Sequence, residues 1–202
     1  MSMKATITDD MKMDIEMDIK MDIKMNIKAE AATDVAATSV AGLERLNRIC
    51  KHPVFLSSLG QIRKLEENRS FCRHELVHLL DVARIAYIEN LEKQLHISKE
   101  MIYAAAMLHD IGRHLQYTHN IPHDEGSAMI AEEILKDCGF SEAEQKELCA
   151  AIRMHRTKET GGQDDLAGLL YRADKQSRMC MFCDAEPECD WSMEKKNMEL
   201  TV

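Results

Sequence analysis

A histidine and an aspartate stand side by side at the end of an apolar run, within residues 104–113. The residues before His109 and Asp110 are small or apolar, which predicts a buried helix, and Gly112 permits a sharp turn directly after the pair. A buried imidazole and a buried carboxylate need partners, because leaving them unpaired costs free energy. A metal ion would satisfy both groups. A His–Asp hydrogen bond that caps a helix would do so as well.

Further polar residues fall at positions that should face inward. His78 lies four residues before the apolar Val82, and Asp174 lies in the middle of an apolar helical pattern. His123 opens a predicted helix and His155 ends one. Each residue alone could be satisfied by ordinary hydrogen bonds. Together with the first pair they supply imidazoles and carboxylates, donors that suit one or two ions of Fe, Mn, Ni, Co or Zn. The candidate metal ligands are His78, His109, Asp110, His123, His155 and Asp174.

The composition predicts an all-α protein that would position these residues on successive helices. Aromatic residues make up 4% of the 202 residues, and there are 3 Pro and 8 Gly, which leaves few turn formers. Ser141 and Glu144 form a capping box that opens a helix. A polar loop is expected over 113–122. Helices are predicted over residues 43–50, 55–69, 72–95, 99–109, 123–136, 141–155 and 165–178.

The chain is expected to contain one folded domain with an extension at each end. Residues 1–41 contain a four-residue repeat of the form Met-Asp-Ile-Lys and then an Ala/Thr-rich stretch, which predicts a low-complexity, disordered N-terminal extension. Residues 42–179 form the predicted domain. Residues 180–202 form a cysteine-bearing tail that is expected to pack on it.

Charge, cysteine content and hydropathy limit the classes of binding partner and the cellular compartment that we expect. The net charge of −9 argues against a nonspecific nucleic-acid binder, which would carry a basic face. Seven cysteines, an odd number, and no apolar signal segment indicate a reducing, cytoplasmic setting. No apolar run approaches the roughly 18 residues of a membrane span, so no membrane partner is expected.

The ordered histidines and aspartates, with their sequence context, resemble the HD-domain metal-dependent phosphohydrolase superfamily. Residues 78–86 resemble its first helix and residues 106–113 its namesake motif. Residues 122–128 resemble the third-histidine helix of the two-metal members, and residues 172–175 resemble the motif with the closing aspartate.

The resemblance implies an all-α HD-domain helical bundle around a metal site. His78, His109, Asp110 and Asp174 would hold a first metal ion. Asp110 would bridge to a second ion held by His123 and His155, as in two-metal phosphodiesterases and dinucleoside tetraphosphate hydrolases. His109 and Asp110 would be catalytic, and Arg113 and Lys175, with Arg178 as a weaker candidate, would bind substrate phosphates.

The implied reaction is hydrolysis of a phosphoester or phosphoanhydride bond by a metal-activated water. The expected substrate is a nucleotide or another small phosphorylated molecule. Two alternatives remain open at this point: a di-iron, oxygen-dependent oxidase on the same scaffold, and a noncatalytic metal or redox sensor. The oligomeric state does not follow from the sequence.

Other residues near the motifs have supporting or neutral interpretations. His74, one turn before His78, is a candidate extra ligand or base, and Asp81 is a candidate for orienting a ligand histidine. The remaining histidines are interpreted as solvent or loop residues. They are His52, His96, His114 and His119.

The cysteines of the tail predict a separate metal or cluster site. Cys180 and Cys183 are separated by two residues, and Cys189 follows after five more. Cys72 is the candidate fourth ligand, because it lies six residues before His78 as Cys180 lies six after Asp174. If both segments were helical and antiparallel, the two thiols would lie at the same end of the bundle, roughly 9 Å along each axis. The expected occupant is zinc or a [4Fe–4S] cluster, and free thiols on a flexible tail are the alternative.

Overall fold

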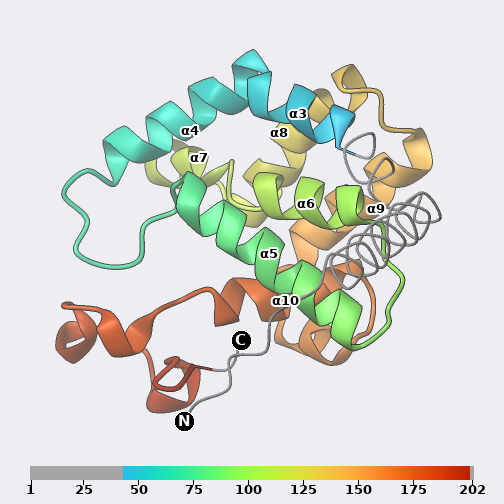
Figure 1. Cartoon of the computed structure of the whole chain (residues 1–202). Helices are drawn as coiled ribbons and strands as arrows, with labels where there is room; N and C mark the ends of the chain where they lie inside the picture. Colours follow the sequence, from blue (N-terminus) through green and yellow to red (C-terminus); the bar gives the residue numbers. More distant parts are fainter. Residues whose placement is uncertain (1–42, 201–202) are drawn as a thin grey trace, which may run out of the picture. The chain divides into compact units, whose positions relative to one another are not determined.

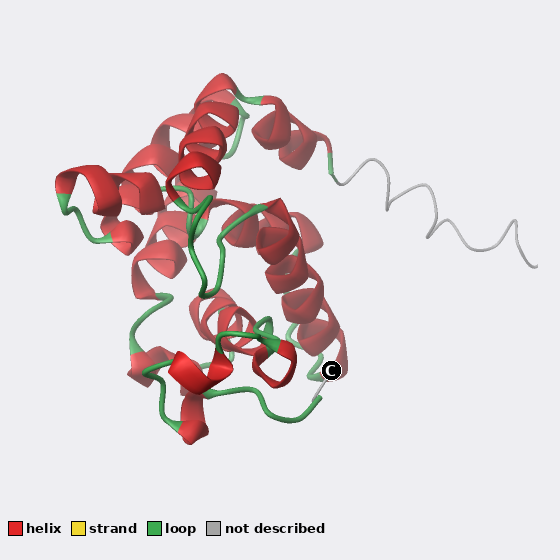
Figure 2. Ribbon diagram, turned by 90° about the vertical axis from the view of Figure 1, so that its left-hand side faces the viewer, coloured by secondary structure: helices red, strands yellow, loops and turns green. Residues whose placement is uncertain are grey.

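The computed structural model describes residues 43–200, which form helices joined by loops, with no strand among them (Figure 2). This confirms the all-α prediction. The N-terminal extension predicted at 1–41 lies outside the described residues and stays a prediction. No helix within 43–200 combines the length and the apolar character needed to cross a membrane.

The helix positions follow the sequence pattern closely in most of the described chain. The first elements are α3 (Glu44–Lys51), α4 (Pro53–Leu65), α5 (Leu76–Glu92) and α6 (Lys99–Leu108). They are followed by α7 (Arg113–His119), α8 (His123–Asp137), α9 (Glu142–Met154), the 3-10 turn η1 (Lys158–Gly162) and α10 (Leu166–Gln176). The capping box at Ser141 and Glu144 is confirmed at the start of α9.

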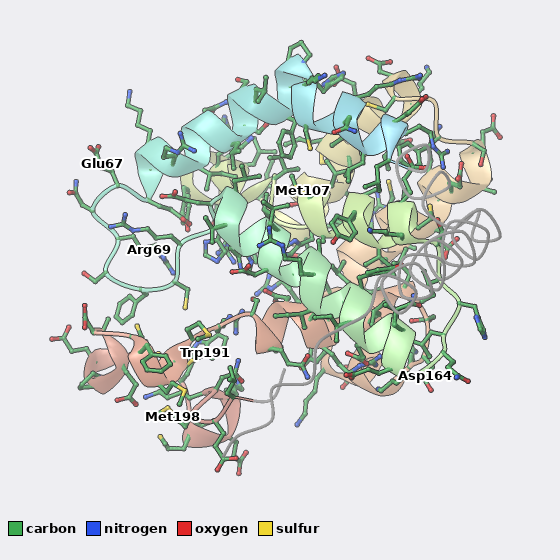
Figure 3. The ribbon with its side chains drawn as sticks, in the orientation of Figure 1. Glu67, Arg69, Met107, Asp164, Trp191 and Met198 are labelled. Atoms are coloured by element: carbon green, nitrogen blue, oxygen red, sulfur yellow. The ribbon has the colours of Figure 1, made fainter. Side chains whose placement is uncertain are left out.

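Helix α6 is the central element and is buried on nearly every side. It packs against α3, α5, α8, α9 and α10. Its three consecutive alanines, 104–106, are fully buried, and their small side chains let neighbouring helices approach the α6 backbone. Met107, labelled in Figure 3, continues this buried run. A helix that is apolar on all sides belongs in a core, so α6 carries the residues that follow it into the interior.

Helix α10 joins the other elements of the candidate site. It packs against α5, α6 and α9, and Figure 1 shows it running across α5. Asp174 on α10 is therefore brought to His78 on α5 and to the end of α6. His123 and His155 reach the same region because α8 and α9 pack against each other and against α6.

The polar loop predicted over 113–122 is wrong, because residues 113–119 form helix α7. The segment lacks a repeating apolar stripe, so its sequence carries no helical signal. The helix is held by tertiary contacts with α8 and α4. His114 is buried, with Nε2 3.2 Å from Ser58 Oγ on α4, so the expectation that it faces solvent is also wrong. Asn120, in the left-handed conformation at φ 57°, ends the helix.

The chain after α10 folds into short turns rather than regular helices. These are η2 (Cys180–Phe182), η3 (Glu186–Glu188) and η4 (Met193–Lys195), and none of them contains a buried residue. Asn197 Nδ2 lies 2.7 Å from the carbonyl oxygen of Lys175 and 2.9 Å from that of Arg178. Trp191, labelled in Figure 3, lies against the Arg178 guanidinium at 3.9 Å. Polar and stacking contacts therefore attach this tail to α10.

Candidate metal centre

Asp110 is the centre of the candidate site. The chain leaves α6 at Leu108, and His109 and Asp110 follow with 0% and 2% exposure. One carboxylate oxygen of Asp110, Oδ2, lies 3.4 Å from His109 Nε2 and 3.5 Å from His78 Nε2. The Asp174 Oδ1 atom lies 3.8 Å and 3.6 Å from the same two nitrogens. Two imidazoles and two carboxylates therefore converge on one side of Asp110.

The other oxygen of Asp110 faces a second pair of histidines. Its Oδ1 atom lies 3.3 Å from His123 Nε2 and 3.8 Å from His155 Nε2. The two Nε2 atoms of His123 and His155 are 3.3 Å apart. The structure thus brings all six predicted ligands together around Asp110, in two groups that share this carboxylate.

Each ligand histidine is oriented through its Nδ1 atom. The Nδ1–H groups of His109 and His155 donate to the carbonyl oxygens of Ala106 and Ile152, at 2.7 and 2.6 Å. The Nδ1–H of His123 donates to Gln116 Oε1 at 2.6 Å. His78 Nδ1 lies 3.3 Å from Ser177 Oγ, whose hydroxyl donates to the Asp174 carbonyl. A proton on Nδ1 leaves the Nε2 lone pair free, which is the form of histidine that binds metals.

The atoms that face the centre lack other partners. His78 Nε2, His109 Nε2 and Asp110 Oδ1 are buried and have no hydrogen bond within the described chain. Ligand atoms about 2.1 Å from one ion stand roughly 3.0–3.4 Å apart in octahedral or tetrahedral geometry. The observed separations of 3.3–3.8 Å are close to that range. The residues present therefore fit divalent metal ions.

The electrostatics of the site also favour a cation. Burial lowers the pKa of His123 to about 3 and that of His155 to about 4, so both rings are neutral at pH 7. Burial opposes the charge of Asp110, but Arg113 and His109 hold the pKa of its carboxyl well below its usual range. Burial likewise opposes the charge of Asp174, but the neighbouring His109, Lys175 and Arg178 hold the pKa of its carboxyl well below its usual range. Two buried carboxylates thus stay ionised beside the neutral rings of His123 and His155.

Three basic side chains border the metal ligands, as the sequence analysis expected of Arg113, Lys175 and Arg178. Arg113 Nε lies 3.6 Å from Asp110 Oδ1 and has no hydrogen-bond partner in the described chain. Lys175 Nζ donates to Asp174 Oδ2 at 2.6 Å and keeps about a third of its side chain exposed. Arg178 Nη2 lies 3.5 Å from the same oxygen.

His74, the expected extra ligand or base, lies beside the ligands, but sequence reasoning missed Glu66 and Tyr117, which hold it there. His74 Nε2 lies 3.8 Å from Asp110 Oδ2, and its Nδ1–H donates to Glu66 Oε1 at 2.7 Å. Tyr117 donates to the same Glu66 oxygen at 2.6 Å. Burial opposes the charge of Glu66, but the hydrogen bond from His74 lowers the pKa of its carboxyl to about 2. No sequence signal pointed to Glu66, which ends α4.

The role expected for Asp81 is wrong. Its carboxylate accepts from Arg84 at 3.4 Å, and Ser177 rather than Asp81 contacts the His78 ring. Gln116 was also missed, because it lies in the segment predicted to be a loop. Gln116 on α7 contacts His123 on α8, seven residues later. This contact depends on how α7 and α8 pack, which the local sequence does not reveal.

The four cysteines of the predicted second site line one cavity of about 490 Å³. Cys72 comes from the loop between α4 and α5, and Cys180, Cys183 and Cys189 come from the tail. Figure 1 shows this loop on the same side of α5 as the tail. The helical premise for placing Cys72 was wrong, because α5 begins at Leu76 and α10 ends at Gln176. His78 and Arg178 line the same cavity, so it borders the metal centre.

Two comparisons with known sequences identify relatives of this chain. An uncharacterized protein of Clostridium beijerinckii is 42% identical over 158 residues, which cover 78% of this chain and 99% of that protein. Ribonuclease Y of Acidothermus cellulolyticus is 31% identical over 108 residues, which cover 53% of this chain and 19% of that enzyme. The chain therefore spans about a fifth of ribonuclease Y.

The fold and the family agree with the site geometry. A crystal structure of a predicted HD superfamily hydrolase from an uncultured Thermotogales bacterium matches with a TM-score of 0.52 and 22% identity, over 76% of this chain and 87% of that one. Residues 76–179, about half of the chain, match the family model described as the HD domain. This range contains Asp110 and the five other candidate ligands that surround it, and the chain belongs to the HD-domain family.

Proposed function

We propose that this protein is a metal-dependent phosphohydrolase that cleaves a phosphoester or phosphoanhydride bond in a small phosphorylated substrate, most simply a nucleotide. The observation that carries the proposal is the arrangement around Asp110. One of its oxygens faces His78 and His109, and the other faces His123 and His155. This arrangement favours two adjacent divalent ions that share the Asp110 carboxylate.

The residues of the chain have separable tasks in this reaction. His78, His109, Asp110 and Asp174 would hold one ion, and His123 and His155, with Asp110, the other. Bound metal ions would supply a water nucleophile at neutral pH and neutralise charge on the phosphoryl oxygens. The imidazoles stay in the ligand form because their Nδ1–H groups are already hydrogen-bonded.

Arg113 and Lys175 are suited to bind the substrate phosphate. The Arg113 Nε donor is buried and free of other partners in the described chain, so it can bind an anionic oxygen without breaking a bond. Lys175 is partly exposed beside Asp174, so it can contact a phosphate arriving from solvent. Arg113 lies next to Asp110 and Lys175 next to Asp174, and both carboxylates would bind metal. The side chains that can hydrogen-bond a phosphate and the metal ligands therefore lie within one site.

The substrate size is inferred from charge and from the relatives. Similarity to a ribonuclease favours phosphoester chemistry. A chain with a net charge of −9 is poorly suited to hold a long polyanion, which would require a basic face. A small phosphorylated molecule needs only the local charges of the metal site and of Arg113 and Lys175.

Metal content and phosphate release test this proposal. The full-length protein is stripped with a chelator, reloaded separately with Mn²⁺, Fe²⁺, Co²⁺, Ni²⁺ or Zn²⁺, and assayed against nucleotides and small phosphoesters. We expect about two ions per chain at the His/Asp site and metal-dependent phosphate release. The D110A variant should lose both ions and at least about hundredfold in activity, because even partners behind metal ligands are worth 10- to 100-fold.

The second His-Asp dipeptide of the chain provides a matched control. Asp124 follows His123 but pairs with Arg156 at the surface, at 3.1 Å, so D124A should keep metal and activity. Equal losses in D110A and D124A would contradict the proposed role of Asp110. Oxygen consumption by the iron form without phosphate release would favour the oxidase, and absence of bound metal after reloading would contradict an enzyme of either kind.

A further inference from the structure

The cavity at the junction of the α4–α5 loop and the tail collects cysteines from distant parts of the chain. All six candidate ligands of the His/Asp centre lie between Cys72 and Cys180 in the sequence. The two cysteines nevertheless line the same cavity, together with Cys183 and Cys189. None of the four is in a disulfide. The other three cysteines are not part of the cavity lining: Cys50, Cys138 and Cys149.

A cation lies beside the thiols of this cavity. Arg178 lines the cavity together with the four cysteines. Arg178 is held over the Trp191 ring at 3.9 Å. A fixed guanidinium beside four thiols places a positive charge where thiolates, the metal-binding form, would be held.

A second cation, Lys196, also lines the cavity. Only 8% of its side chain is exposed, and its Nζ donates to Glu186 Oε1 at 2.8 Å and to the Glu186 carbonyl at 3.1 Å. Acidic side chains also line the cavity, but two of them have their own partners: Glu186 pairs with Lys196 and Asp81 with Arg84. Four thiolates around a core of charge 2+ would leave two net negative charges, which Arg178 and Lys196 can partly compensate.

The tail itself lacks a hydrophobic core that could hold its shape. The three turns η2, η3 and η4 contain no buried residue, while Phe182 is 73% exposed and Met193 63% exposed. Short segments that fold without enough apolar burial are commonly held by disulfides or metals. Disulfides are absent from the described residues, so a bound inorganic centre would add to the polar and stacking contacts that attach the tail to α10.

The spacing of the sulfur atoms favours a cluster over a single ion. Thiolates around a tetrahedral zinc ion stand about 3.8 Å apart. No three cysteine sulfur atoms in residues 43–200 lie within 4.8 Å of one another, although the His/Asp ligands form two such groups. An iron–sulfur cube binds each thiolate at a different iron atom, so it spaces them farther apart and fills more of the cavity.

We propose that Cys72, Cys180, Cys183 and Cys189 bind a [4Fe–4S] cluster that anchors the tail beside the His/Asp metal centre. Arg178 lies between the two centres, because it lines the cysteine cavity and also approaches Asp174 Oδ2 at 3.5 Å. The cluster is independent of the proposed hydrolysis, and its ligands include none of the six residues around Asp110.

Acid-labile sulfide distinguishes this cluster from iron at the His/Asp centre. The full-length protein is purified anaerobically, reconstituted with iron and sulfide, and analysed for iron, zinc and sulfide, with visible absorption before and after reduction by dithionite. We expect about four sulfides per chain, about four irons beyond those lost in D110A, and absorption that bleaches on reduction. The D110A variant should keep its sulfide even if it has lost all hydrolysis.

Single cysteine substitutions locate the cluster. C72S and C183S should each lose most of the sulfide, whereas C50S, a half-buried cysteine on α3, should keep it. Cys72 lies on the α4–α5 loop and Cys183 on the tail, so one variant can still test the proposal if the other folds poorly. Sulfide retained in both C72S and C183S would overturn the proposal. So would stoichiometric zinc without sulfide at these thiols, or no metal at them at all.

Discussion

His123 and His155 face each other through ring nitrogens that both lack a hydrogen. Their Nδ1–H groups are committed to Gln116 and to the Ile152 carbonyl, so two Nε2 lone pairs meet at 3.3 Å. Two acceptors at this distance repel each other unless a cation or a proton lies between them. With Asp110 Oδ1 as the third donor, this is the part of the site in which the need for a metal is most evident.

Gln116 should therefore act as a positioning residue for the second ion. We expect Q116A to weaken that ion's binding by about 10- to 100-fold, because His123 would lose the partner that fixes its ring and its tautomer. Metal titration of the chelator-treated protein by calorimetry measures the effect without relying on activity. Q116E keeps an acceptor for the Nδ1–H and should restore binding.

Gln61 is a matched control for this substitution. It lies on α4, where its side chain hydrogen-bonds Ser57 Oγ at 3.4 Å and no other residue of the described chain. Q61A should titrate like the wild-type protein. An unchanged second binding step in Q116A would mean that the backbone of α8 alone is enough to orient His123.

At the scale of elements, the close approach of α7 to α8 depends on Gly112. A Cβ atom added there would lie 2.1 Å from the backbone nitrogen of Ser127 and 2.2 Å from the carbonyl carbon of Gly126. The Gly112 N–H also donates to Ser127 Oγ at 2.9 Å. Because His123 is the first residue of α8, this contact sets the distance between the two groups of metal ligands.

The G112A variant should be strongly destabilised. Separating two packed backbones costs about 3 kcal/mol or more of unfolding free energy. Urea denaturation at pH 7 measures the change. Gly60, in the middle of α4, has no atom within 4 Å of an added Cβ, and G60A should be neutral or stabilising by roughly 0.5–1 kcal/mol. A G112A protein as stable as G60A would show that α7 and α8 can separate without penalty.

The sequence was most informative where a polar residue interrupts an apolar helix. Asp174 and His78 stand out in this way, because burial of such groups without partners is costly. Helix α7 and Gln116 could not be predicted, since neither has a local pattern and both depend on contacts with α8. The role of Glu66 could not be predicted for the same reason, because its partners His74 and Tyr117 are 8 and 51 residues away in the sequence.

For the molecule as a whole, Arg45 ties the first described helix to two later ones. Its guanidinium donates to Glu100 Oε2 on α6, at 2.7 Å, and with two nitrogens to the carboxylate of Glu144 on α9, at 2.9 Å each. It also lies over the Phe140 ring at 4.1 Å. The arginine thus connects α3 with α6 and α9, the helices that precede Asp110 and His155.

The pair of Arg45 and Glu144 should make stability depend on pH. The hydrogen bond from Arg45 lowers the pKa of Glu144 from 4.5 to about 2 in the folded protein. A lowered pKa means that the ionised form stabilises the fold above pH 4.5, and that this contribution disappears as the pH falls toward 2. E144Q keeps a side chain suited to the capping box with Ser141 but removes the charge, so it isolates the ion pair.

We expect E144Q to lower the unfolding free energy at pH 7 by about 1–2 kcal/mol, a value reduced by partial solvent screening. The difference from wild type should shrink as urea denaturation is repeated at successively lower pH below 4.5. Glu142, exposed in the same first turn of α9, has no ion-pair partner among residues 43–200, so E142Q should change stability by only a few tenths of a kcal/mol. If E144Q and E142Q differ from wild type by the same small amount at every pH, Arg45 does not hold α3 to α9 through charge, and its bonds to Glu100 and its stacking on Phe140 would be the contacts that fix α3.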